Sequence, residues 1–177
     1  MIRCALLVFL LSSALLLRGQ DRLHLYPDDN LVWRDMLAHV ENGLVRLGAS
    51  WNGDVVFTLQ HDALWEETKV FQGFSTSALD VAFTVRENKL YLGDQLFTDA
   101  VLYTYHEGQI FAGHSTFAMD VVYTLREETR GFSGAGNAPL WGVYKEDSWS
   151  WSDRVGVIEG RPDVPRVLAI LSAAGLL

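Results

Sequence analysis

The stretch Gln109–Leu125 reads Gln-Ile-Phe-Ala-Gly-His-Ser-Thr-Phe-Ala-Met-Asp-Val-Val-Tyr-Thr-Leu, and it sets the pattern for the rest of the chain. A short apolar run ends at Gly113, and a second run begins at Asp120 and ends at Thr124. The stretch Lys69–Val85 repeats this arrangement, with the same residue types at Gly73, Ser75, Asp80, Phe83 and Thr84. The chain is therefore built from repeats.

The repeat frame is apolar-aromatic-x-Gly, then Asp seven residues later, then apolar-x-aromatic-Thr. It occurs four times in the middle of the chain, over residues 44–62, 69–88, 89–108 and 109–127. The frame positions of these copies are Gly48, Gly73, Gly93 and Gly113; Asp54, Asp80, Ala100 and Asp120; and Thr58, Thr84, Thr104 and Thr124. Weaker copies precede and follow, with Asp35 and His39 in the first and Asp153 and Val157 in the last. A period near 20 residues is typical of an array whose units bury their apolar faces on one another.

Each copy is predicted to form two strands joined as a hairpin. Alternation along Asp80–Val85 places Val81, Phe83 and Val85 on one face and Ala82 and Thr84 on the other. The fold class is therefore all-β, an array of about six β-hairpin repeats with a short C-terminal helix. A single curved sheet, a solenoid and a closed barrel all use this alternation, and the sequence leaves the three open.

The end of the chain changes character and predicts a helix within residues 162–177. Asp163 is a suitable N-cap, Pro165 suits the first turn and Gly175 suits the stop. We expect this helix to cap the repeat domain, residues 21–161, by closing the open end of its sheet.

The first 20 residues have the pattern of a secretory signal peptide. Arg3 precedes an apolar segment from Cys4 to Leu17, which is shorter than the roughly 20 residues that span a bilayer. Cys4 is the only cysteine, so the exported chain would have no disulfide. We expect a secreted or periplasmic protein with no stable membrane span after signal cleavage, and the net charge of −8 argues against a nucleic-acid partner.

The repeated Asp is the first candidate for chemistry, because stacked carboxylates are able to bind calcium. Each copy offers one Asp without a neighbouring acid, so a turn role, in which the carboxylate accepts backbone N–H bonds, is the favoured interpretation. The five histidines show no metal-ligand spacing, and no nucleophile or phosphate-binding motif is present. We expect no catalytic residue, no metal and no cofactor.

Tryptophans provide the stronger functional signal. Trp141, Trp149 and Trp151 flank a Gly-rich segment, and the spacing of the last two places both indoles on one face of a strand. They are candidates for a glycan- or protein-binding surface, and the alternative is that they close the core at the end of the array. Trp65, on the connector between copies, is either a packing residue or an exposed contact. The Thr positions are predicted to face outward and to offer a second contact surface.

The motif residues around Gly73 and Gly113 resemble those of small, secreted, mostly uncharacterised bacterial proteins with tandem units of the form Ile-Tyr-x-Gly-x-Ser, then Asp-Ile-x-Tyr-Thr. The resemblance implies a hairpin array outside the cytoplasm and brings no known catalytic residues. Choline-binding repeats have a similar length, but their Gly-Trp pairs are absent from the central copies. The sequence therefore predicts a non-enzymatic binding or surface-interaction module with an unknown protein or glycan partner. The alternatives are a small carbohydrate-active hydrolase that uses Asp pairs and a purely structural envelope protein.

Overall fold

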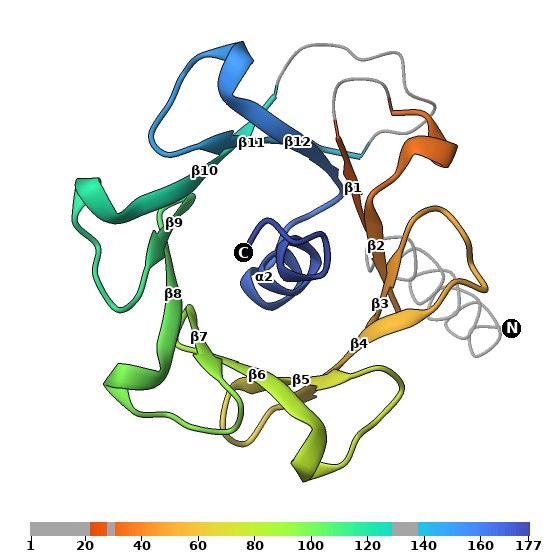
Figure 1. Cartoon of the computed structure of the whole chain (residues 1–177), viewed down its shortest axis with the longest axis vertical. Helices are drawn as coiled ribbons and strands as arrows, with labels where there is room; N and C mark the ends of the chain where they lie inside the picture. Colours follow the sequence, from red (N-terminus) through yellow and green to blue (C-terminus); the bar gives the residue numbers. More distant parts are fainter. Residues whose placement is uncertain (1–21, 28–30, 129–137) are drawn as a thin grey trace, which may run out of the picture.

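The computed structural model describes residues 22–27, 31–128 and 138–177. Within them, twelve antiparallel strands form one closed barrel, in which β1 pairs with both β2 and β12. The strands are β1 Leu23–Tyr26, β2 Ala38–Glu41, β3 Leu44–Leu47, β4 Val55–Asp62, β5 Glu67–Gln72, β6 Val81–Arg86, β7 Lys89–Leu92, β8 Val101–His106, β9 Gln109–Ala112, β10 Val121–Glu127, β11 Leu140–Lys145 and β12 Arg154–Glu159. Figure 1 shows the ring closed around the helix α2, Val164–Ala173. The all-β repeat fold is confirmed, and of the three predicted arrangements the barrel is the one observed.

Each repeat contributes two strands and one outer loop between them, so that units 1 to 6 are the pairs β1–β2, β3–β4, β5–β6, β7–β8, β9–β10 and β11–β12. The loops project away from the barrel (Figure 1). Five of them carry a short 3-10 turn directly before the second strand: η2 Trp33–Asp35, η3 Ala78–Asp80, η4 Thr98–Ala100, η5 Ala118–Asp120 and η6 Trp151–Asp153. The repeated Asp position is therefore the last residue of this turn.

Tight turns connect consecutive units at the opposite end of the barrel. Asn42-Gly43, Glu87-Asn88 and Glu107-Gly108 all have positive φ angles, as a two-residue type I′ hairpin turn requires. Asn and Gly adopt this backbone conformation readily. These three two-residue turns are much shorter than the outer loops at the other end of the barrel.

An equivalent residue from each first strand points into the interior, together with residues of second strands such as Val40, Val85 and Leu125. The first-strand residues are almost fully buried and belong to a single cluster: Leu25, Val45, Val70, Leu90, Ile110 and Val143. The helix supplies the centre of this cluster with Val167–Leu171. Because strands surround it, the helix buries more than one face. It therefore fills the barrel and does not close the end of an open sheet.

The helix begins as its sequence indicates. The Asp163 side chain accepts a hydrogen bond from the Arg166 backbone N–H at 3.0 Å, and Pro165 lies in the first turn. Gly175, with φ of +71°, follows the last turn. No helix in the described ranges is long and apolar enough to cross a membrane.

A β-bulge in the second strand of unit 3 changes the predicted alternation. Phe71 pairs with Val81 and Val70 pairs with Phe83, so the register shifts at Ala82. Val81 therefore lies on the outer face with Phe71, whereas Phe83 packs against the interior cluster. The prediction that Val81 and Phe83 share a face is wrong, because a bulge adds one residue to the strand and reverses the alternation beyond it.

Candidate functional site

The Thr position links each unit to the next. Its side chain donates a hydrogen bond to the carbonyl oxygen of the Gly position of the following unit: Thr58 to Gly73 at 2.6 Å, Thr84 to Gly93 at 2.8 Å, Thr104 to Gly113 at 2.7 Å and Thr124 to Glu146 at 2.7 Å. His39, in the Thr position of unit 1, contacts the Gly48 carbonyl in the same way through Nδ1 at 2.9 Å. The backbone N–H of the Gly position also bonds back to the preceding unit, as from Gly93 to Ala82.

These links bury the Thr side chains. Thr84 is fully buried, and Thr104 and Thr124 are nearly so. The expectation that the Thr positions form an outward contact surface is therefore wrong for Thr84, Thr104 and Thr124, whereas Thr58 is half-buried. Outward-facing residues of a barrel strand are normally solvated, but here the outer loops lie over them.

The Asp position makes a different hydrogen bond from the predicted one. The Ser75 hydroxyl donates to the Asp80 carboxylate at 2.5 Å, and Ser148 does the same to Asp153. Each Ser oxygen also accepts the backbone N–H of the residue two positions later. Ser and Asp together hold the outer loop in shape, and the carboxylate partner is a hydroxyl, not a backbone N–H.

The outer loops expose a large amount of apolar surface. Among the described residues, the exposed large apolar side chains are Trp33, Leu47, Trp51, Leu64, Trp65, Phe74, Leu79, Leu92, Leu96, Phe97, Phe117, Met119, Trp149 and Trp151. All except Leu64 and Trp65 lie in an outer loop or at the strand end next to one. Leu79 and Met119 are the most exposed, at 95% and 89%. Exposed apolar side chains concentrated in this way are typical of an interaction surface.

The outer loop of unit 6 is supported by a polar cluster on the barrel wall. This Trp149–Trp151 cluster consists of Arg126, Glu128, Tyr144, Trp149, Trp151 and Arg154. The Arg126 guanidinium lies 3.5 Å from the Trp149 ring centroid, and that of Arg154 lies 4.4 Å from the Trp151 centroid. Stacking of guanidinium on indole holds both rings in place while leaving Trp149 79% exposed.

Glu128 connects the two halves of this cluster. Arg154 donates to both of its carboxylate oxygens, at 3.0 and 3.1 Å, and the Tyr144 hydroxyl donates at 3.0 Å. Burial raises the pKa of the Glu128 carboxyl, and the hydrogen bond from Tyr144 opposes this shift. Gly142 makes room for the arrangement, since a Cβ there would lie 2.2 Å from the Glu128 Oε1 atom.

The four predicted tryptophans do not form one surface. Trp149 and Trp151 lie in an outer loop and its 3-10 turn, not on a strand as predicted. Trp141 lies on β11 and packs against the interior cluster. Trp65 is exposed in the turn between β4 and β5, at the opposite end of the barrel from the outer loops. The structure thus brings together only Trp149 and Trp151.

A second aromatic cluster, absent from the sequence predictions, lies where the first and last strands meet. This His–Trp cluster consists of His24, Trp33, His39, Trp51 and Glu159. The two indoles stack with their centroids 5.1 Å apart, and each contacts one histidine edge to face, Trp33 with His24 at 5.6 Å and Trp51 with His39 at 5.2 Å. The sequence signal for it is His39 in a Thr position, but its pairing with His24 depends on strand register.

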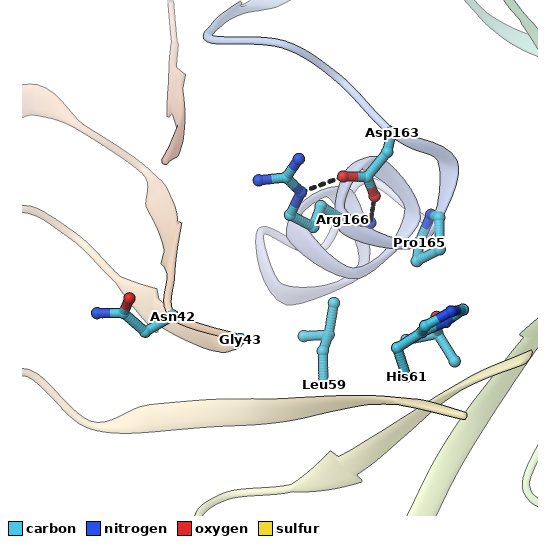
Figure 2. A pocket seen from close by; sticks show the side chains of 8 residues that line it. Asn42, Gly43, Leu59, His61, Asp163, Pro165 and Arg166 are labelled. Atoms are coloured by element: carbon cyan, nitrogen blue, oxygen red, sulfur yellow. Dashed lines mark hydrogen bonds and ion pairs between the residues drawn. The ribbon is translucent and has the colours of Figure 1, made fainter. Parts of the chain in front are cut away.

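A pocket of about 470 Å³ lies between the start of α2 and the strands β4 and β5. Figure 2 shows Asp163 and Arg166 bonded to each other on the helix side, with Leu59 and His61 opposite. His61 already contacts the Thr68 hydroxyl at 3.2 Å. The polar groups of this pocket are therefore engaged with one another, and it does not form the candidate site. No cluster of three or more His, Cys, Asp or Glu side chains suited to a metal occurs in the described part of the chain.

Of the comparisons with known proteins, the match to a family model bears on the architecture. No curated protein matches the chain. A protein from Arabidopsis thaliana with an X-ray structure aligns over 88% of each chain, with 16% identity and a TM-score of 0.43. The family model described as "6-fold beta flower protein" matches residues 25–137, which is more than half of the chain. With six two-strand units closed into one ring, this protein belongs to the 6-fold beta flower family.

Proposed function

We propose that this repeat module is a non-enzymatic binding protein that contacts a protein partner through its outer loops. The observation that carries the proposal is the confinement of exposed apolar side chains to these loops, apart from Leu64 and Trp65, among the described residues. Burying such side chains against a partner removes apolar surface from water, which drives association.

The kinds of residue exposed favour a protein partner over a glycan. Leu79 and Met119 are aliphatic and protrude almost completely, and such side chains offer no flat ring on which a sugar can stack. Aromatic residues, Met and Arg are enriched in the centres of protein interfaces. The Trp149–Trp151 cluster supplies rigid indoles with Arg behind them, a combination that often dominates binding energy.

The charge of the chain restricts the partner further. The net charge is −8, and the outer loops carry acidic residues such as Asp80, Asp94, Asp120 and Asp147. A partner surface with apolar pockets surrounded by basic residues would complement this face. A nucleic acid would be repelled.

The arrangement of acids supports a binding role over hydrolysis. The Asp position occurs once per loop, and the carboxylates of Asp80 and Asp153 are bonded to Ser hydroxyls of the same loop. Glycoside hydrolysis needs two carboxyl groups that face one cleft. Repeated acids on separate, outward-projecting loops are poorly placed for this.

The N-terminal segment supports a site of action outside the cytoplasm. Its charged start and apolar core have the pattern of a signal peptide, and residues 1–21 lie outside the described residues. N-terminal sequencing of the mature protein tests this proposal. Recovery of intact Met1 would contradict it.

The binding proposal is tested by comparing two sets of exposed tryptophans. The double variant Trp149→Ala/Trp151→Ala removes indoles from an outer loop, and Trp65→Ala removes one of comparable exposure at the opposite end. Each full-length protein is immobilised and exposed to the native envelope fraction, and the proteins that it retains are quantified by mass spectrometry. We expect a specific protein retained by the wild type and by Trp65→Ala, and at least tenfold less of it on the double variant, with all three melting temperatures alike.

Glycan panels provide the opposing test. Binding of a glycan that the double variant loses, without any retained protein, would replace the protein partner with a sugar. Release of a cleaved sugar that is abolished in Asp120→Asn but kept in Trp151→Ala would instead establish the hydrolase alternative and end the non-enzymatic proposal.

A further inference from the structure

His24 and His39 lie opposite each other on the outer face of β1 and β2. They are direct partners in the antiparallel register, and their neighbours Leu23, Leu25, Ala38 and Val40 point into the barrel. The two imidazole rings have their centroids 6.4 Å apart and are nearly perpendicular. His39 is only 1% exposed.

Each ring is held by a hydrogen bond from Nδ1. His24 contacts the Glu159 carboxylate on β12 at 3.0 Å, and His39 contacts the Gly48 carbonyl oxygen after β3 at 2.9 Å. These partners lie on opposite sides of the pair, because the strand order is β12, β1, β2, β3. Each Nδ1 is therefore drawn toward a strand outside the pair, that of His24 toward β12 and that of His39 toward the end of β3.

Both Nε2 atoms are buried and have no hydrogen-bond partner among the described residues. Leaving a buried polar atom without a partner is unfavourable, so a pair of them at one place calls for an explanation. A carbonyl acceptor at Nδ1 places the proton of a neutral His39 there and leaves the Nε2 lone pair available.

Metal-binding histidines have this arrangement. A histidine that coordinates through one ring nitrogen normally donates from the other to a carboxylate or a backbone carbonyl, which fixes the tautomer. His24 has the carboxylate and His39 has the carbonyl. Two metal–nitrogen bonds of about 2.0 Å in a line would place the ring centroids roughly 6 Å apart, close to the observed separation.

We propose that His24 and His39 form a two-coordinate site for a soft monovalent metal ion of the Cu(I) type. Two imidazole ligands satisfy such an ion, whereas Zn(II) needs four ligands. The stacked indoles of Trp33 and Trp51 lie against the two rings and restrict water.

The repeat itself supplies the decisive variant. In four other units the position of His39 is Thr, and its hydroxyl makes the same bond to the next unit. His39→Thr therefore keeps the inter-unit link and removes only the ligand. His106→Ala, at an exposed histidine on β8, is the matched control.

Ag(I), a redox-stable analogue of Cu(I), is titrated in chloride-free buffer into the full chain carrying Cys4→Ser, which removes the one thiol of the sequence. Native mass spectrometry counts the bound ions, and tryptophan fluorescence follows the indoles of the site. We expect one Ag(I) per chain with quenched fluorescence, unchanged binding in His106→Ala, and at least 100-fold weaker binding in His39→Thr and in His24→Gln. Trp33→Phe should bind Ag(I) with much less quenching.

Three outcomes would overturn the proposal. They are no bound Ag(I) in the wild type, equal binding in folded His39→Thr, and Zn(II) binding as tight as that of Ag(I). Circular dichroism and the melting temperature of each variant establish that loss of binding is not loss of the fold.

Discussion

The outer face of units 3 to 5 differs from the outer face of units 6, 1 and 2, which meet where the ring closes. The two faces share the same backbone arrangement but carry different side chains. In units 3 to 5, the aromatic residue before the outer loop is buried, at Phe71, Tyr91 and Phe111, and so are its counterparts Tyr26 and Tyr144 in units 1 and 6. In unit 2 the equivalent position is Arg46, whose guanidinium bonds to the Gly53 carbonyl at 2.7 Å. The neighbouring faces hold the His–Trp and Trp149–Trp151 clusters.

This comparison shows which parts of the repeat are constrained. The link between units uses backbone atoms and a single side-chain donor, so Thr, or His39, satisfies it equally. The inward residues must fill the barrel. The outer face is free to vary, and the two candidate clusters lie where it departs from the repeat.

The largest expected effect is on stability, from substitutions that test whether units 1 and 4 share one hydrophobic core. Leu25→Ala and Leu90→Ala remove the same inward residue from units 1 and 4, and both side chains are almost fully buried. Each should lower the free energy of unfolding by about 2–5 kcal/mol, measured by urea denaturation. A much smaller effect for Leu25→Ala would mean that the junction of β1 and β12 is not part of the common core.

Substitutions at the Gly position should have the next largest effect on stability. The effect should be a loss in unit 5 and a gain in unit 6. Gly113 has φ of +66° and no atom within 4 Å of a built Cβ, so Gly113→Val is opposed by conformation and not by a clash. It should lower stability by about 1–3 kcal/mol. Glu146 holds the same position in unit 6 with φ of +52°, so Glu146→Gly should raise stability by about 1 kcal/mol. Thermal denaturation of both variants measures this, and an unchanged melting temperature in Gly113→Val would refute the role of the glycine.

Loss of the inter-unit hydrogen bond should lower stability somewhat less, and by the same amount in unit 4 and in unit 1. Thr104→Val leaves the Gly113 carbonyl without its side-chain donor and should lower stability by about 1–3 kcal/mol, whereas Thr104→Ser retains the hydroxyl. The difference in stability between His39→Val and His39→Thr isolates the same bond in unit 1. Unequal values in urea denaturation would show that His39 does not substitute for Thr in this link.

The smallest expected effect is a difference in phenol pKa between Tyr91 and Tyr144, which occupy the same repeat position in units 4 and 6. Burial raises the pKa of Tyr91, and burial together with Glu128 raises that of Tyr144 to about 12. Because the folded pKa lies above the ordinary value of about 10, the stabilisation by the neutral phenol is complete below pH 10 and is lost as the pH rises through 12. Absorbance titration of Tyr144→Phe and Tyr91→Phe should assign the later ionisation to Tyr144. If Tyr91 ionised at a higher pH than Tyr144, Glu128 would not be the cause of the raised pKa of Tyr144.

Local pattern was sufficient to predict the units but not how they close. Turn residues, β-branched runs and the Asp163 N-cap identify six two-strand repeats and a helix, because each depends on neighbours in sequence. Closure depends on the pairing of β1 with β12, and alternation is the same in an open sheet. The helix was misplaced for the same reason, since an interior exists only once the ring is closed.

The residues of the candidate sites were harder to predict because their positions depend on loops and contacts between units. Thr84 has the position of a solvated strand residue, and only its link to Gly93 shows that it is buried. Trp149 and Trp151 alternate as strand residues would, yet they lie in a loop and a 3-10 turn. His24 and His39 become neighbours through strand register, which a single sequence does not reveal.

The position of α2 at the centre of the ring has a consequence for biosynthesis. The residues that fill the middle, Val167–Leu171, leave the ribosome after all twelve strands. A nascent chain interrupted before Val164 would carry every strand and still enclose a hollow. A chain that stops short of this helix would therefore carry the whole ring of strands and lack the side chains that fill its centre.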